Sequence, residues 1–145
     1  MAEKRDFSAF MKGASEERKN IRIAISDRFK DAEGNPIEWE LRPVTAEEDR
    51  ELRKKHTHRN RSRVSNQQTQ FFDSAAYIDE LNALSVVYPD LNDKALQDSY
   101  GVMGAVDLLY KLLDSAGEMG NLTIAVNELS GLNTDIEDRI EEAKN

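Results

Sequence analysis

The sequence of 145 residues contains no cysteine. This absence excludes a disulfide framework, a thiolate metal site and a cysteine nucleophile, and it fits a protein of the cytosol. Long apolar runs are missing too, since no stretch approaches the ~18 uninterrupted apolar residues that a membrane span requires. Residues 1–6 are charged rather than apolar, unlike the start of a signal peptide. We therefore expect a cytoplasmic protein that is neither exported nor inserted into a membrane.

The motifs of common enzyme classes are also absent. The chain has no nucleophile elbow, phosphate-binding loop, dinucleotide-binding glycine pattern or zinc-protease helix. The run from Asp90 begins like a calcium loop, but Ala95 replaces its turn glycine and Gly101 its bidentate glutamate. His56 and His58 lie among cations that would repel a metal ion. We expect a protein that is not an enzyme and uses no cofactor.

Charge is distributed unevenly along the chain. Residues 1–70 carry 16 basic and 13 acidic side chains, residues 71–145 carry 4 and 15, and the net charge is -8. Six Lys and Arg residues fall within residues 53–63, with no aromatic between them to stack on bases. Because an acidic chain repels a polyphosphate backbone, we expect this cluster to be a solvated loop or to contact an acidic protein, rather than to bind nucleic acid.

Alternating apolar residues predict strands at residues 21–25 and 37–41. Gly34 and Asn35, among other turn formers, lie between them and predict a β-hairpin. The three isoleucines of the first strand and Trp39 of the second would share one apolar face. A two-stranded hairpin is marginal in water, so we expect helices to cover this face and Trp39 to lie in the core.

Apolar residues at helical spacing predict about five or six short helices. Thr45 and Glu48 form a capping-box pair that begins a helix running to about Lys55. The polar residues 56–70 predict a flexible, basic, irregular insert. Asn92 is the predicted cap of a later helix. The remaining helices are predicted around residues 77–88, 95–100, 108–113 and 119–129, and in an acidic tail at 132–145. The predicted fold class is α+β, with the N-terminal hairpin packed against a mainly helical domain within residues 1–131.

Three stretches resemble a known family in their order and spacing. They are FxxFMK at residues 7–12, IEWELRP followed by TxEED at residues 37–49, and above all VYPDLNDxxLQDSYGVMG at residues 87–104. Together they resemble the XkdN-like tail assembly chaperones of long-tailed phages and prophages in Gram-positive bacteria. The polar residues 56–70 match only as a variable insert.

The resemblance implies a role in tail morphogenesis. Such a protein works in the host cytoplasm, keeps the aggregation-prone tape measure protein soluble, helps tail tube subunits polymerise around it, and is absent from the finished virion. Proteins of this kind are often made in two lengths by programmed frameshifting, and this chain would be the short form. Self-association is left open. The alternatives are a structural tail or head-tail component retained in the particle, and an acidic interaction or regulatory module.

Two short apolar stripes are the candidate partner-binding residues. Phe7, Phe10 and Met11 have the spacing of one or two helical turns near the start of the chain. Ile136 and Ile140 lie one turn apart in the acidic tail. Both stripes could cover the amphipathic helices of a client by helix-in-groove docking.

Overall fold

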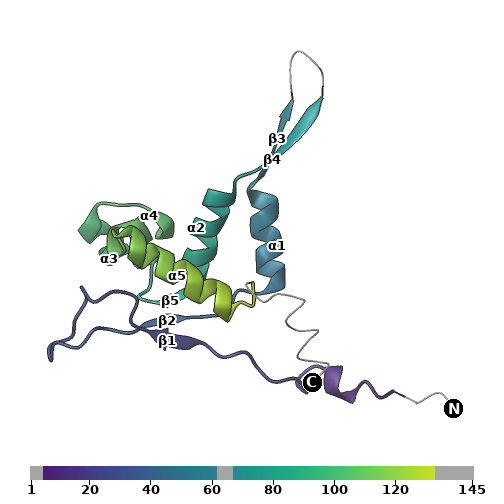
Figure 1. The fold of residues 1–145 in the computed structure, drawn as a ribbon, viewed down its shortest axis with the longest axis horizontal. Coiled ribbons are helices and arrows are strands. Elements are labelled where there is room, and N and C mark those ends of the chain that lie inside the picture. The colour runs from purple at the N-terminus through teal and green to yellow at the C-terminus, as the bar shows by residue number, and fades with distance from the viewer. Residues whose placement is uncertain (1–4, 62–66, 133–145) are drawn as a thin grey trace.

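The computed structural model describes residues 5–61 and 67–132, and within them it confirms the α+β class (Figure 1). Five α-helices, five strands and one short 3₁₀ helix follow one another in these ranges. In chain order they are η1 (Ser8–Phe10), β1 (Ile21–Ile23), β2 (Trp39–Leu41), α1 (Ala46–Lys55), β3 (Thr57–Arg61), β4 (Gln68–Phe72), α2 (Ser74–Ser85), β5 (Val86–Tyr88), α3 (Lys94–Tyr100), α4 (Ala105–Leu112) and α5 (Ala116–Leu129). The predicted tail at 132–145, with Ile136 and Ile140, falls almost wholly outside the described residues.

A small antiparallel sheet in the order β1-β2-β5 supports the body. The predicted hairpin is confirmed, because Ile21 and Ile23 of β1 pair with Leu41 and Trp39 of β2. Trp39 is 2% exposed and lies in the core as expected. The prediction that all three isoleucines are covered was wrong for Ile23, which is 38% exposed. β1 is an edge strand, so its apolar face is only partly sheltered.

The third strand, β5, corrects the prediction of a helix that runs to residue 88. The helix α2 ends at Ser85, and β5 pairs with β2 through Glu40 opposite Tyr88 and Leu41 opposite Val86. Two more hydrogen bonds join the strands at this point: the Arg42 N–H donates to the Ser85 carbonyl (2.8 Å), and the Ser85 hydroxyl donates to the Arg42 carbonyl (2.7 Å). This pairing between distant segments provides hydrogen-bond partners for backbone N–H and C=O groups that would otherwise be paired within a helix.

Helix α2 is the central helix of the core and lies against α1, α4 and α5. Its Tyr77 and Leu81 are buried, as the helical spacing predicted. The leucines of α4 and of the turn after it are also buried, which confirms that run as a core helix. The buried hydrophobic residues are Ile25, Trp39, Leu41, Val44, Tyr77, Leu81, Val86, Leu91, Leu108, Leu109, Leu112, Leu113, Leu122, Ala125 and Val126.

The helix starts follow local capping chemistry. Thr45 accepts a hydrogen bond from the Glu48 N–H (3.1 Å), and the Glu48 carboxylate accepts one from the Thr45 N–H (3.1 Å), so the predicted capping box is confirmed. The cap of α3 was predicted one residue too early. Asp93, not Asn92, accepts from the Leu96 N–H (2.8 Å), while Asn92 belongs to the preceding turn and donates its own N–H to Asp90.

Residues 57–61 and 68–72 form a second hairpin, β3–β4, which projects from the body (Figure 1). The prediction of an irregular insert across residues 56–70 was therefore wrong in these two ranges. Five residue pairs join the strands, from Thr57 opposite Phe72 to Arg61 opposite Gln68. The side chains of residues 57–60 and 68–72 are exposed on both faces, so the sequence has no apolar alternation that would have predicted the strands.

No helix in the two described ranges combines the length and the apolar character that a membrane crossing needs.

Candidate protein-binding surfaces

Residues 5–20 form an N-terminal arm that extends away from the body (Figure 1). Every residue of this arm is exposed. Phe7, Phe10 and Met11 are 70%, 84% and 64% exposed, around the single turn of η1. The structure therefore places the three candidate residues of the N-terminal stripe in water, within or at the ends of one turn. Three large apolar side chains left in water form a cluster that contact with a partner would bury.

The base of the projecting hairpin is held by an arrangement of charged and aromatic side chains. The Arg53 guanidinium lies 4.9 Å from the ring centroid of Tyr77 and 5.9 Å from that of Phe72, and its Nε donates to Asp49 (2.9 Å). The Tyr77 hydroxyl also donates to Asp49. The hydrogen bond to Asp49 raises the pKa of Arg53, and burial followed by the bond to Asp49 raises the pKa of Tyr77.

His56 lies in this base, so the prediction that it belongs to a solvated loop was wrong. Its side chain is buried, and its Nε2 lies 3.2 Å from the Glu80 carboxylate. Lys55 donates a hydrogen bond to the same carboxylate (2.6 Å). The His56 carbonyl accepts from the Asp73 N–H (2.9 Å), which ties the start of β3 to the end of β4. These contacts give His56 a structural role at the point where the hairpin leaves the body.

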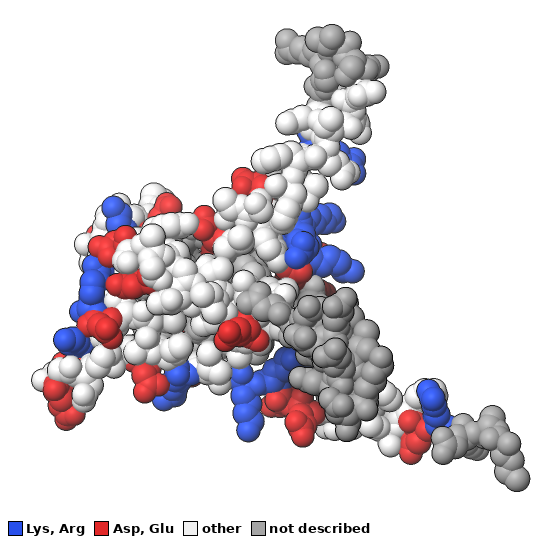
Figure 2. Space-filling view, in the orientation of Figure 1, with Lys and Arg blue, Asp and Glu red and all other residues white. Residues whose placement is uncertain are grey.

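Basic side chains gather beside α1, below the projecting hairpin (Figure 2). Arg50, Arg53 and Lys54 of α1 and Arg59 of β3 are exposed. Part of the predicted basic cluster is thus held on regular structure. Phe71 of β4 is also exposed. Arg63 lies outside the described residues.

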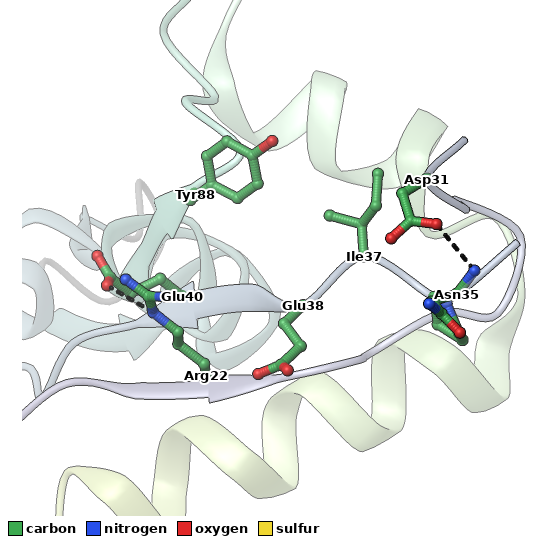
Figure 3. Close-up of a pocket in the computed structure, with 8 residues that line it drawn as sticks. Arg22, Asp31, Asn35, Ile37, Glu38, Glu40 and Tyr88 are labelled. Atoms are coloured by element: carbon green, nitrogen blue, oxygen red, sulfur yellow. Dashed lines mark hydrogen bonds and ion pairs between the residues drawn. The ribbon is translucent and has the colours of Figure 1, made fainter. Parts of the chain in front are cut away.

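A polar hollow of about 610 Å³ lies along the sheet (Figure 3). Arg22 and Glu40 form an ion pair across β1 and β2 (3.5 Å), and Asp31 accepts from the Asn35 N–H (3.0 Å) at the tip of the loop between the strands. These two contacts pair four of the polar residues that line the hollow.

An aromatic pocket of about 190 Å³ adjoins the polar hollow, and the two share Ile37 and Tyr88. Tyr88 and Tyr100 are exposed at its rim, whereas Trp39 is buried. The sequence indicated Trp39 only as a core residue, and the pocket was missed because five separate stretches of the chain build it. Every lining residue is apolar or aromatic: Phe29, Ile37, Trp39, Tyr88, Pro89, Leu96, Tyr100 and Leu112.

Comparison with known proteins gives these surfaces a biological context. A sequence model described as phage XkdN-like tail assembly chaperone protein matches residues 7–144. Over 144 residues the chain is 35% identical to the phage-like element PBSX protein XkdN of Bacillus subtilis strain 168, covering 97% of this chain and 94% of that protein.

A second relative has a solved structure. The uncharacterized protein YqbN of the same strain is 31% identical over 144 residues, covering 97% of this chain and 93% of YqbN. A crystal structure of YqbN superposes with a TM-score of 0.74 at 25% identity, over 89% of this chain and 98% of that one. Sequence and fold agree over nearly the whole length, and the chain therefore belongs to the family of phage XkdN-like tail assembly chaperones.

Proposed function

We propose that this chain binds the tape measure protein during tail assembly, keeps it soluble, and helps tail tube subunits polymerise around it. The observation that carries the proposal is the N-terminal arm, whose Phe7, Phe10 and Met11 are exposed in a member of a tail assembly chaperone family. Burying one such side chain is worth about 1.5–3 kcal/mol. A cluster of three could hold an amphipathic helix of the client against the arm.

Two further considerations support a chaperone that is not an enzyme. Covering a client by apolar contact needs no catalytic centre and no cofactor. The net charge of -8 gives copies of a chaperone–client complex a mutual repulsion that opposes aggregation. In this proposal the protein acts in the host cytoplasm, leaves before the virion is complete, and works with a longer frameshifted form of itself where one is made.

Coexpression with the tape measure protein of the same phage tests the proposal. We expect the client to move from the insoluble to the soluble fraction when this chain, alone or with an extended form, is present. Phe7→Asp combined with Phe10→Asp should abolish the effect, because charged side chains cannot bury against an apolar helix face. A client that remains insoluble with both forms would contradict the proposal.

The matched control replaces an exposed apolar residue elsewhere. Phe71→Asp makes the same chemical change on the projecting hairpin, where Phe71 is 57% exposed. We expect this variant to rescue the client as well as the unchanged chain does. Loss of rescue by Phe71→Asp with rescue retained by the arm variant would move the client site to the hairpin. Circular dichroism of each variant establishes that it is folded.

The alternative function is a structural component retained in the particle. Mass spectrometry of purified virions separates the two functions, because a chaperone should be lost from the finished tail. Recovery of this chain at the stoichiometry of a tail protein would favour the structural role.

A further inference from the structure

The N-terminal arm and the aromatic pocket are apolar surfaces of matching chemistry on the same chain. The arm presents Phe7, Phe10 and Met11 to water, and the pocket is lined by apolar and aromatic side chains throughout. We propose that, in the absence of a client, the arm of one copy docks in the aromatic pocket of a second copy and places a phenylalanine ring there.

The direction of β1 makes this contact intermolecular. The arm leaves the body before Ile21, which pairs with Leu41, whereas the pocket lies at the opposite end of the strand pair, beyond Ile23 and its partner Trp39. The loop that follows β1 carries Phe29 to the pocket, where its carbonyl accepts from the Ile37 N–H (2.8 Å). The arm thus leaves from the end of the strand pair opposite the pocket of its own chain, and Figure 1 shows it extending away from the body.

The pocket has the size and lining that a single ring requires. Its volume is about 190 Å³. An apolar cavity of ~150 Å³ is large enough to bind benzene. Tyr88 and Tyr100 stand at the rim and can pack edge-on against an incoming ring, while Trp39 forms the floor. One phenylalanine of the arm fills this space, and the second lies against the rim.

Charge on the two surfaces is complementary. Residues 5–20 carry four basic and three acidic side chains; Lys12 follows the apolar cluster directly, and Arg5 precedes it with Asp6 in between. Residues 30–38 and 88–100, which surround the pocket, carry six acidic and two basic side chains. The arm thus has a net charge of +1 and the segments around the pocket one of -4, which favours this pairing over docking of the acidic segments of the chain.

Such a contact joins different surfaces on the two copies. Each copy offers one arm and one pocket, so the association is heterologous and continues until a ring closes or an open chain grows. It also covers the apolar cluster when no client is present. This inference does not rest on the proposed function, because the contact is between copies of one chain and is measured without any client.

Sedimentation velocity of the purified chain over a range of concentrations tests the contact. We expect the average mass to rise with concentration for the unchanged chain and for Phe71→Asp, the matched control outside both surfaces. The arm variant, Phe7→Asp with Phe10→Asp, and the pocket variant, Tyr88→Asp with Tyr100→Asp, should each remain monomeric. At about 100 μM, even a contact with a binding free energy of ~5.5 kcal/mol would form a detectable fraction of complexes. An unchanged chain that is still monomeric at this concentration would overturn the proposal.

Mixing the two variants gives a second, sharper test. The pocket variant still has an intact arm and the arm variant an intact pocket, so an equimolar mixture should form 1:1 dimers and nothing larger. A mixture that stays monomeric while the unchanged chain associates would place the contact elsewhere and overturn the proposal.

A fluorescence titration covers the case in which the pocket variant fails to fold. Trp39 is the one tryptophan of the chain and lines the pocket, so its emission reports on occupancy. A synthetic peptide of residues 5–20 added to the arm variant should change this emission in a saturable way. The same peptide with both phenylalanines replaced by aspartate should not, and equal responses to the two peptides would contradict docking of the arm.

Discussion

Arg42, directly after β2, and Glu48, in the first turn of α1, are joined by two parallel hydrogen bonds of 2.9 and 2.7 Å. The same carboxylate accepts the N–H of Thr45, so one side chain links the end of the sheet to the start of the helix. The hydrogen bonds from Arg42 lower the pKa of Glu48 to about 2, and the bonds from Thr45 add to this effect.

This pair predicts a specific dependence of stability on pH. A carboxyl whose pKa is lowered in the folded state contributes stability above its unfolded pKa of about 4.5, and that contribution is lost as the pH falls toward about 2. Glu48→Gln should lower the free energy of unfolding at pH 7 by about 1 kcal/mol, because water screens a partly exposed pair. Urea unfolding measures this effect: the difference in free energy of unfolding between the unchanged chain and Glu48→Gln should be smaller at pH 3 than at pH 7.

Glu47→Gln is the control for this measurement. Glu47 lies in the same turn of α1 and is exposed, and its replacement leaves the Arg42 pair intact. We expect its stability to follow that of the unchanged chain at both pH values. A Glu48→Gln deficit that is the same at pH 7 and pH 3 would show that the ion pair does not supply the stability.

Trp39 and Ile23 are opposite each other across the strands but differ in burial, which predicts unequal costs of truncation. Trp39→Ala should lower the free energy of unfolding by about 3–5 kcal/mol, since it empties a large buried site. Ile23→Ala should cost about 1 kcal/mol, because much of that side chain is already in water. Chemical denaturation measures both, and a Trp39→Ala loss below about 1 kcal/mol would contradict its place in the core.

The projecting hairpin should be dispensable for folding. Thr57 lies opposite Phe72, so residues 58–71 can be replaced by an Asn-Gly turn that closes the strands at that pair. Phe72 and its contacts to Tyr77 and Arg53 stay in place. We expect the melting temperature to change by less than about 2 °C, because residues 58–60 and 67–71 are exposed and the free energy of loop closure varies slowly with loop length. A cooperative loss of structure would show that the hairpin packs on the body.

Features fixed by neighbouring residues were predictable from the sequence. The capping box of Thr45 and Glu48 depends on four consecutive residues, and the buried leucines of α4 follow a strong helical period. The strand β5 was missed because Tyr88 continues the spacing of α2, and only its pairing with Glu40 distinguishes a strand from a further helical turn. Strand pairing between segments more than forty residues apart leaves no pattern in the local sequence from which the strand could be predicted.

Of the two apolar surfaces, the N-terminal arm could be predicted from the sequence and the aromatic pocket could not. Phe7, Phe10 and Met11 stand out in a charged segment, so their exposure on an arm could be anticipated from their isolation. The aromatic pocket could not be anticipated, because its aromatic residues come from four separate parts of the chain: Phe29, Trp39, Tyr88 and Tyr100. Each of these residues alone is typical of a core, and only the fold leaves an opening between them.

The central claim, that the chain holds the tape measure protein in solution, is tested most directly by an aggregation assay with purified components. Tape measure protein diluted out of denaturant should scatter light as it aggregates, and a stoichiometric amount of this chain, alone or with its extended form, should suppress that scattering. Phe7→Asp with Phe10→Asp should restore it, because the arm can then no longer cover apolar helix faces. Scattering that is unchanged by an excess of either form would contradict the account.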